Sequence, residues 1–455
     1  MPLSVVVLAA GHGKRMCSSL PKVLHPLAGR PLLAHVLDLA RGLDADAIHV
    51  VYGHGGAAVR ARFPDSDLQW AEQAEQLGTG HAVMQALPQV NADHDVLVLC
   101  GDVPLIRVAT LQRLVEIAAK AKLAVLTAEV AEPTGYGRIV RDAAGNVQRI
   151  VEQNDASETE LAITEINTGI VVGEAAAMSR WLGKLSNANA QGEYYLTDII
   201  ELATRDGVAV AGYRLPDIDE AMGINDKTHL AAAERKLQHR RAEAVMLEGA
   251  TLADPARIDI RGTLKVGSDV FIDVNAVFEG EVELGDGCRI GPNCYFRDVR
   301  IGAGTQVFAN SYIEESTIGA DCNIGPFARM RPGSALADRV KIGNFVETKK
   351  AIIAAGSKVN HLTYVGDSEV GTNVNIGAGT ITSNYDGANK HLTKIGNDVF
   401  VGSGVNLVAP ITIGDGATIG AGSTLNKDAP PGELTIARAR QTSITGWKRP
   451  KKKQG

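Results

Sequence analysis

The chain has 455 residues, of which 45% are hydrophobic, and a net charge of −6 at pH 7. This length predicts at least two hydrophobic cores, and the hydrophobic content excludes wholesale disorder. A weakly acidic chain has no overall attraction for nucleic acid or anionic lipid. The N-terminus lacks a signal-peptide layout, and no apolar run is long enough to span a bilayer. We therefore expect a cytoplasmic protein that binds no nucleic acid and does not insert into a membrane.

Apolar runs alternate with helical segments through the first half of the chain. Strands are predicted at 4–9, 47–52, 68–71 and 95–99, and helices at 78–86 and 194–204. This alternation predicts a mostly parallel sheet with helices on both faces. Ligands of such sheets bind beyond the carboxyl ends of the strands, where Gly11, Gly78 and Asp102 lie. Three separated stretches are therefore expected to form one crevice.

A glycine-rich loop, residues 11–15, follows the first strand. A strand, a glycine loop and a helix in succession present backbone N–H groups to phosphate, and Arg15 and Lys22 add positive charge. Mg²⁺ prefers one or two carboxylates together with phosphate oxygens, so Asp102 near such a loop is a candidate ligand. A single aspartate can equally cap a turn, and only the convergence of the three stretches favours the metal site.

Residues 226–247 contain no Gly or Pro and are rich in strong helix formers, and Gly249 is suited to follow a helix end. The predicted organisation is a nucleotide-binding domain at 1–227, a helical linker at 228–248 and a second domain at 249–455. The second domain ends in a basic tail formed by Lys448, Arg449 and Lys451–Lys453.

Between Val266 and Leu425 a bulky apolar residue recurs about every six positions. This period fits neither a helix nor a flat strand, and it predicts a solenoid whose short strands turn a corner one after another. Small residues often lie four positions after a repeat residue, and we interpret Cys288, Cys294 and Cys322 as core residues of this kind. The five cysteines are too scattered for a disulfide framework or a zinc site.

Interruptions of the repeat indicate where the solenoid carries function. The longest, between 376 and 395, contains a polar segment at 382–390 that must project from the coil. Arg331, Lys349 and His361 lie off the repeat positions. The two cations suit a phosphorylated ligand, and a neutral imidazole can accept a proton near neutral pH. A lone histidine is ordinarily a surface residue, so this role depends on the basic residues and Tyr364 nearby.

Several stretches of the first half together resemble the signature of sugar-1-phosphate nucleotidyltransferases: 8–16, 21–24, 73–82, 133–138, 165–169 and 192–198. The six-residue repeat resembles the hexapeptide family. The whole chain is similar to the bacterial family of bifunctional N-acetylglucosamine-1-phosphate uridyltransferases and glucosamine-1-phosphate acetyltransferases. This resemblance implies an α/β Rossmann-like domain joined by a long helix to a left-handed parallel β-helix. Lys14 and Cys100 depart from the pattern, which has a small hydroxyl residue and a tyrosine there.

The resemblance implies a uridyltransferase site in the first domain that uses UTP and Mg²⁺. Asp102 and Asn225 would hold the metal, and Arg15 and Lys22 would be catalytic residues that neutralise the triphosphate. Residues expected to bind UTP or UDP-N-acetylglucosamine are Leu8, Ala9, Ala10, Gly11, Lys22, Gln73, Gly78, Thr79, Gly137, Glu152, Asn167 and Asn225.

It also implies that the second domain transfers an acetyl group from acetyl-CoA to glucosamine 1-phosphate, with His361 as general base. The expected sugar-phosphate ligands are Arg331, Lys349, Tyr364 and Asn375, and the expected acetyl-CoA ligands are Asn384, Tyr385, Ser403, Ala421 and Arg438. The family's usual assembly is a homotrimer. The final product would supply synthesis of the bacterial cell wall and outer envelope.

Two other hypotheses remain open from the sequence. In one, the nucleotidyltransferase acts alone and the solenoid is a regulatory or oligomerising domain. His361 and the projecting segment argue against this hypothesis. In the other, the whole chain is a non-catalytic scaffold.

Overall fold

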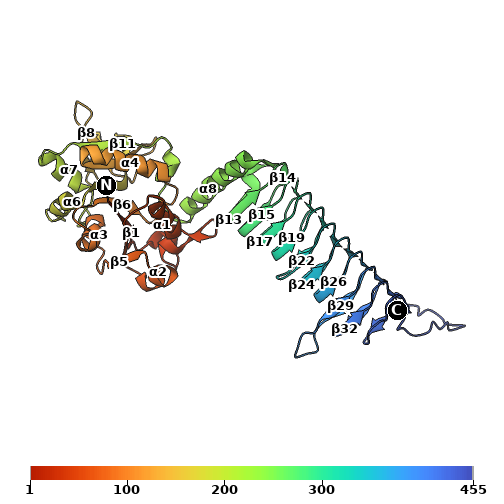
Figure 1. Cartoon of the computed structure of the whole chain (residues 1–455). Helices are drawn as coiled ribbons and strands as arrows, with labels where there is room; N and C mark the ends of the chain where they lie inside the picture. The colour runs from red at the N-terminus through yellow and green to blue at the C-terminus, as the bar shows by residue number, and fades with distance from the viewer. Residues whose placement is uncertain (1, 453–455) are drawn as a thin grey trace. The chain divides into compact units, whose positions relative to one another are not determined.

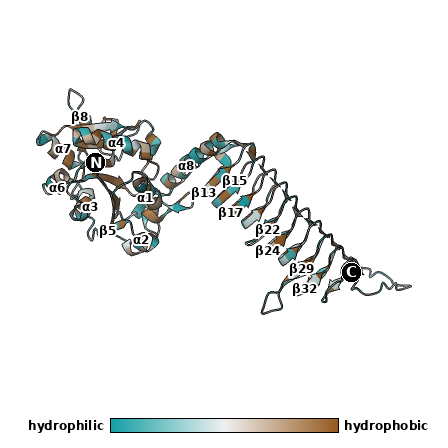
Figure 2. Ribbon diagram, viewed as in Figure 1, coloured by the Kyte–Doolittle hydropathy of each residue, from teal (hydrophilic) through white to brown (hydrophobic). Residues whose placement is uncertain are grey.

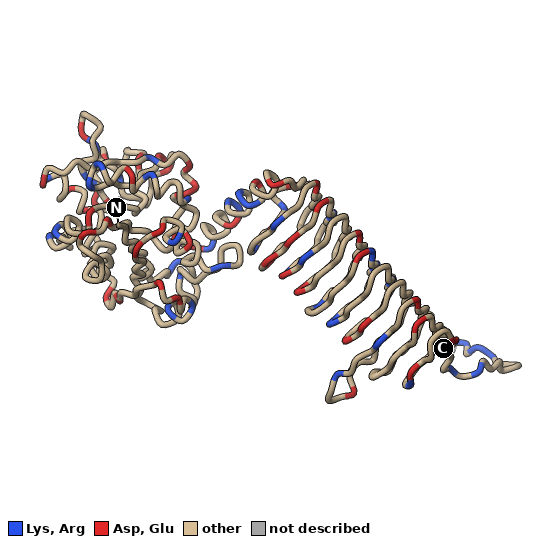
Figure 3. Tube along the Cα trace, viewed as in Figure 1, with Lys and Arg blue, Asp and Glu red and all other residues tan. Residues whose placement is uncertain are grey.

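The structure is a computed structural model that describes residues 2–452. The contacts divide the chain into two compact units, with the boundary between Leu237 and Gln238. The boundary falls inside helix α8 (Lys227–Glu248), which confirms the helix predicted over 226–247. No helix in residues 2–452 is long and apolar enough to cross a membrane. The basic tail colours the C-terminal segment blue in Figure 3, and its last member, Lys453, lies outside the described residues.

The first unit is built on a sheet with strand order β11-β7-β10-β6-β1-β4-β5, in which only β10 runs antiparallel to its neighbours. The strands predicted from the sequence are confirmed, and the central ones consist almost wholly of buried hydrophobic residues (Figure 2). The strands are β1 (Leu3–Ala9), β4 (Ala47–Tyr52), β5 (Leu68–Glu72), β6 (Asp95–Cys100), β7 (Leu123–Glu129), β10 (Glu165–Glu174) and β11 (Val210–Arg214). Off this path lie the hairpin β8 (Arg138–Arg141) and β9 (Val147–Val151), and the short pair β2 (Pro26–Leu27) and β3 (Arg30–Pro31).

Helices cover both faces of the sheet and form two separate apolar clusters with it (Figure 1). One face carries α1 (Leu32–Gly42), α2 (Gly56–Arg62) and α4 (Val108–Ala121). The other carries α3 (Thr79–Ala86), α6 (Ala175–Leu182) and α7 (Asp198–Arg205). Shorter helices are α5 (Glu158–Leu161), η1 (Lys14–Met16), η2 (Lys22–Leu24), η3 (Leu87–Gln89) and η4 (Ile218–Ala221). The unit is therefore the α/β/α sandwich that the strand–helix alternation predicts.

Two local predictions in this unit are wrong. The glycine loop is followed by the single turn η1, because Gly13 and Cys17 on either side of it adopt left-handed backbone angles that cannot continue a helix. The helix predicted from Tyr194 begins only at Asp198. The Tyr194 N–H donates to the carbonyl of Leu77 and its carbonyl accepts from Gly80, both at 2.8 Å, so this segment is extended.

A buried histidine makes the stability of this unit depend on pH. His49 in β4 is 0% exposed and neither ring nitrogen has a hydrogen-bond partner. Burial lowers the pKa of His49 below its ordinary 6.5; the side chain of Gln89 opposes this shift in part, and the charge of His94 adds to it. The unfolded chain then binds more protons than the folded unit below about pH 6.5, so stability is expected to fall by up to about 1.4 kcal/mol per pH unit there and to be unaffected above it.

Unfolding midpoints at pH 7.5 and 5.5 check this prediction. The midpoints at the two pH values should differ less in His49→Leu than in the wild type. In His239→Leu, at an exposed position of α8, they should differ by as much as in the wild type. An unchanged pH dependence in His49→Leu would contradict the assignment.

The second unit is a parallel β-helix. Paired residues are 17 or 18 positions apart, as with Tyr295 and Tyr312 or Val277 and Tyr295, so one coil takes about three six-residue repeats. The repeat residues predicted from Ile272 to Leu425 are all buried, and Phe278 stacks on Phe296 with ring centroids 5.3 Å apart. The three repeat cysteines are buried free thiols, as predicted.

The strands form two long sheets. The first contains β12 (Ala250–Leu252), β14 (Val270–Ile272), β16 (Arg289–Ile290), β18 (Gln306–Val307), β20 (Asn323–Ile324), β23 (Lys341–Asn344), β25 (Lys358–His361), β27 (Asn375–Ile376), β30 (Phe400–Val401), β33 (Thr418–Ile419) and β35 (Leu434–Thr435). The second contains β13 (Ile258–Val266), β15 (Ala276–Leu284), β17 (Tyr295–Ile301), β19 (Tyr312–Ile318), β21 (Arg329–Met330), β24 (Glu347–Ile353), β26 (Tyr364–Val370), β28 (Ile381–Ser383), β31 (Asn406–Val408) and β34 (Thr424–Leu425). Branching from it are β22 (Ala335–Leu336), β29 (Thr393–Ile395) and β32 (Ile411–Ile413), and η5 (Pro255–Arg257) precedes β13.

The two irregular parts of this unit are its first coil and a projecting hairpin. The second half of α8 covers the first coil: the Gln238 amide donates to the carbonyl of Ile260 (3.0 Å) and accepts from its N–H (2.7 Å). Farther along, Ile381 pairs with Asn406, 25 positions later, because the coil between them contains a hairpin closed by Tyr385 and Lys390. This hairpin is the polar segment expected to project (Figure 1).

Candidate active sites

A crevice of about 370 Å³ opens at the carboxyl edge of the sheet in the first unit. The ends of β1, β5 and β6 bring the three separated stretches together there. The predicted residues that line it are Leu8, Ala9, Ala10, Gly11, Lys22, Gln73, Gly78, Thr79 and Asp102.

The wall at Gly78 depends on glycine. Gly78 has a φ of 109°, and a Cβ there would lie 2.6 Å from the carbonyl oxygen of Tyr194. The buried Gln73 amide donates to the carbonyl of Gly78 (3.0 Å), and the Thr79 hydroxyl accepts from the N–H of Leu196 (3.1 Å). These contacts hold a bare backbone against the crevice, where a flat base can approach it closely.

Two oxygens in the crevice converge on one cation. The ammonium of Lys22 pairs with the carboxylate of Asp102 and donates to the side-chain oxygen of Asn225 at 3.1 Å. The Lys22 ammonium thus lies where a bound cation would contact both the Asp102 and the Asn225 oxygen. One carboxylate and one amide oxygen beside a phosphate-binding loop fit the ligands that Mg²⁺ takes from proteins.

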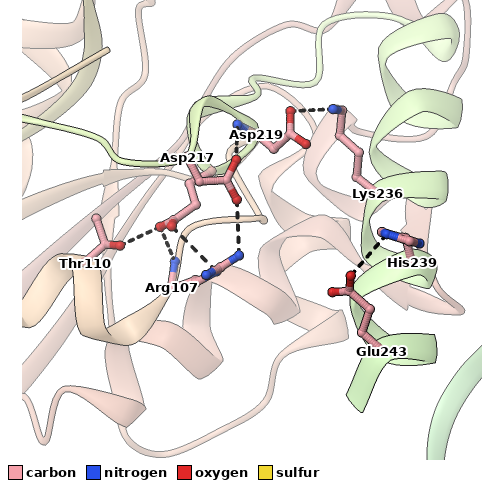
Figure 4. Close-up of polar contacts among 8 residues, drawn as sticks. Arg107, Thr110, Asp217, Asp219, Lys236, His239 and Glu243 are labelled. Carbon is pink, nitrogen blue, oxygen red and sulfur yellow. Dashed lines mark hydrogen bonds and ion pairs between the residues drawn. The ribbon is translucent and has the colours of Figure 1, made fainter. Parts of the chain in front are cut away.

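Asn225 is held in place by a short segment that crosses the end of β6. The N–H of Ile224 donates to the carbonyl of Asp102 at 2.9 Å. Upstream, the buried Glu220 carboxylate accepts from the N–H of Arg107 (3.0 Å) and the hydroxyl of Thr110 (2.6 Å), at the start of α4 (Figure 4). A carboxylate at a helix N-terminus is stabilised by the unpaired N–H groups and the helix dipole. Both metal-ligand candidates are thereby fixed to the same framework.

A second cavity, of about 100 Å³, adjoins the crevice and shares Leu8, Thr79 and Cys100 with it. Glu152 and Asn167 line it, and the carbonyl of Gly137 accepts from the N–H of Asn167 at 2.9 Å. The Glu152 carboxylate accepts from the hydroxyl of Thr197 at 3.0 Å. The three residues predicted to contact the sugar therefore lie together.

Three ionisable groups in or beside this cavity have raised pKa values. Burial raises the pKa of Glu152, and burial followed by Glu201 raises the pKa of Asp198 to about 6. Burial also raises the pKa of Cys100 to about 12, so this departure from the family pattern places a neutral thiol between the two cavities.

The structure does not place Arg15 with the other residues of this site. Arg15 lies exposed on η1 and is not among the residues that line either cavity. Lys14 is likewise exposed. His12, Gln76 and Glu193 line the crevice and were not predicted. All three lie inside stretches that carry the family resemblance, which is the signal that could have found them.

In the second unit a group of cations lies on one side of the coil. Arg331 pairs with Glu347 at 2.9 Å, and Lys349 lies two residues farther along β24. Lys390 from the projecting hairpin lies close enough to lower the pKa of Lys349. Adjacent ammonium groups repel each other unless an anion joins them, so this arrangement suits a phosphate. Lys390 was not predicted, although it lies in the segment expected to project.

Asn384 lies next to this cationic group. Its side-chain nitrogen donates to Asp367 and, at 3.4 Å, to the hydroxyl of Tyr364. Tyr385 follows on the hairpin and is 59% exposed. Asn375 belongs to the other long sheet, where it pairs with Lys358 and Phe400 on the strand next to the one that carries His361.

His361 is exposed at the end of β25, and its Nδ1 lies 3.1 Å from the side-chain oxygen of Asn344. The register of the following coils places small residues above it, in a column formed by Ala378, Ser403 and Ala421. Arg438 closes the column by donating to the carbonyl of Ala421 at 2.6 Å. The structure thus groups three of the predicted acetyl-CoA ligands with His361, at about 4.8 Å per coil. Ala378 was not predicted, although counting one coil on from His361 would have indicated it.

The fold and these sites define a two-domain transferase, with a nucleotidyltransferase unit followed by a hexapeptide-repeat unit. The MobA-like NTP transferase domain matches residues 5–161, the GMPPB C-terminal domain matches 260–344, and the bacterial transferase hexapeptide (six repeats) matches 392–427.

The chain belongs to the GlmU family of bifunctional proteins. It is 59% identical over 452 residues to the bifunctional protein GlmU of Azoarcus sp. (strain BH72), which covers 99% of this chain and 100% of that protein. It is 57% identical over 453 residues to those of Chromobacterium violaceum and Stenotrophomonas maltophilia (strain K279a), with at least 99% of each chain covered. Membership of a bifunctional family argues against both remaining hypotheses, a non-catalytic scaffold and a nucleotidyltransferase that acts alone.

Proposed function

We propose that this enzyme catalyses two consecutive reactions of UDP-N-acetylglucosamine synthesis. The second unit transfers the acetyl group of acetyl-CoA to glucosamine 1-phosphate, and the first unit joins the product to UTP with release of pyrophosphate. The observation that carries this proposal is the presence in one chain of a crevice with converging oxygens and of a β-helix that carries both an exposed histidine and a cationic group. Because UTP and acetyl-CoA are cytoplasmic metabolites, we place the enzyme in the cytoplasm.

The uridylyl transfer needs positioning and charge neutralisation more than a protein nucleophile. A phosphate oxygen of N-acetylglucosamine 1-phosphate attacks the α-phosphorus of UTP, and the bond to the β-phosphate oxygen breaks. Gln73 and the Gly78 backbone hold the base, Glu152 and Asn167 hold the sugar, and Lys22 binds phosphate. Asp102 and Asn225 would hold Mg²⁺, which neutralises the charge on the phosphates when bound.

The acetyl transfer needs a base because the amine of the substrate is protonated near neutral pH. His361 accepts a proton from the ammonium group, the free amine attacks the thioester carbonyl, and the bond to the CoA sulfur breaks. Arg331, Lys349 and Lys390 bind the sugar phosphate. The thioester lies along the column above His361, where Ala378, Ser403 and Ala421 leave room.

The corner beside His361 supports a trimer. Phe327, Phe345 and Leu362 stack in one column, are 48%, 54% and 62% exposed, and have φ between 42° and 58°. Left-handed angles cost a bulky residue on the order of 1 kcal/mol or more. Three exposed apolar residues in a strained conformation are explained by burial against a second copy of this chain, which would also bring a neighbour's groups to His361.

The double variant Phe327→Asn/Phe345→Asn is expected to dissociate the trimer without unfolding it. Asn310 precedes Phe327 in the same column with a φ of 61°, so asparagine fits these corners. Light scattering after size-exclusion chromatography checks the mass, and a variant that remains trimeric at micromolar concentration would refute this interface.

Separate assays test the proposed reactions. CoA release requires glucosamine 1-phosphate and acetyl-CoA, and pyrophosphate release requires UTP and N-acetylglucosamine 1-phosphate. Removing divalent metal with a chelator is expected to stop pyrophosphate release and to leave CoA release unchanged, and added Mg²⁺ should restore the former. Equal loss of both activities would contradict the assignment of the metal to the first unit.

A further inference from the structure

Asn344 and His361 occupy equivalent positions on neighbouring coils. They are direct partners in the parallel register between β23 and β25. The Asn344 side-chain oxygen lies 3.1 Å from Nδ1 of His361, and the Asn344 carbonyl accepts from the N–H of Leu362 at 3.1 Å. The hydroxyl of Thr363 donates to the carbonyl of His361 at 2.6 Å. One residue therefore binds both the ring and the backbone of the corner that carries the histidine.

The hydrogen bond has a chemical consequence. An amide oxygen only accepts, so Nδ1 of His361 carries the ring proton when it is bonded to Asn344. The other nitrogen, Nε2, then carries the lone pair and is free to accept a proton. Without an acceptor at position 344 the ring is free to rotate and to exchange tautomers, and only part of the population presents a basic Nε2.

We propose that Asn344 is a positioning residue for acetyl transfer, holding His361 in the tautomer whose Nε2 takes the proton of the substrate ammonium. This proposal rests on the proposed function of the second unit. Asn344 acts through His361, so its loss affects turnover rather than substrate binding. Loss of a group that fixes the orientation and tautomer of a functional histidine typically lowers activity roughly 10- to 100-fold.

Two variants of Asn344 test the proposal in the full-length enzyme. Asn344→Leu keeps the size but removes the acceptor, and kcat for CoA release should fall roughly 10- to 100-fold with KM for both substrates within about twofold. Asn344→Asp keeps an acceptor for Nδ1–H and should restore most of kcat. The added negative charge favours the imidazolium, so the acid limb of the kcat–pH profile should move to higher pH.

Controls separate this proposal from the proposed function and from misfolding. Asn323→Leu, in β20 of the same sheet, should retain wild-type kcat, and pyrophosphate release by all variants should be unchanged. Wild-type kcat in Asn344→Leu, or an Asn344→Asp enzyme with neither restored kcat nor a shifted pH profile, would overturn the positioning role. If the wild-type enzyme itself releases no CoA in the presence of glucosamine 1-phosphate, the proposed function fails instead.

Discussion

Replacing His361 by alanine is expected to reduce CoA release by roughly 100- to 10,000-fold, the usual contribution of a general base. His361 is exposed at a coil corner, so its removal leaves no cavity and the β-helix should fold normally. Pyrophosphate release by the first unit should be unchanged. The measurement is the rate of thiol appearance with saturating glucosamine 1-phosphate and acetyl-CoA.

The matched control for this variant is His239→Ala, another exposed histidine, which lies on α8 and pairs with Glu243. It should have wild-type rates in both assays. Retention of more than about a tenth of the wild-type CoA release by His361→Ala would show that this side chain is not the base.

The variant Asp102→Asn is expected to have a rate of uridylyl transfer lower by roughly 100-fold or more. Of the two side-chain oxygens that converge in the crevice, that of Asp102 is charged and that of Asn225 is neutral, so the substitution removes the negative charge. The fold should be preserved, since the hydrogen bond from Ile224 goes to the backbone carbonyl of residue 102. Pyrophosphate release measured over a range of Mg²⁺ concentrations should show that the variant needs more metal. CoA release should be unaffected.

The surface carboxylate Asp38 provides the control, because it pairs with exposed arginines that do not line the crevice. Asp38→Asn should match the wild type at every Mg²⁺ concentration. An Asp102→Asn enzyme with wild-type activity and an unchanged metal requirement would exclude Asp102 as a ligand.

The architecture was predictable because both units repeat a short pattern many times. Every repeat residue from Ile272 to Leu425 adds to the same signal, and a single exception does not change it. The loop at Gly13 was not predictable in the same way. Its local sequence is compatible with a helix. The turn is confined to Lys14–Met16 because Gly13 before it and Cys17 after it adopt left-handed backbone angles.

The candidate sites were predictable where they follow from strand ends and not where they follow from the register between coils. Gly11, Gly78 and Asp102 meet because parallel strands end at one edge. The partnership of Asn344 with His361 depends on a coil of 17 rather than 18 residues. Lys390 reaches Lys349 only through the fold of the hairpin. Spacing in the sequence does not determine these two contacts.

The most direct test is to incubate the enzyme with glucosamine 1-phosphate, acetyl-CoA, UTP and Mg²⁺ and to identify the products by mass. The expected products are UDP-N-acetylglucosamine, CoA and pyrophosphate, and N-acetylglucosamine 1-phosphate should accumulate when UTP is left out. Unchanged acetyl-CoA, or a nucleotide sugar without the acetyl group as the main product, would contradict the proposed function.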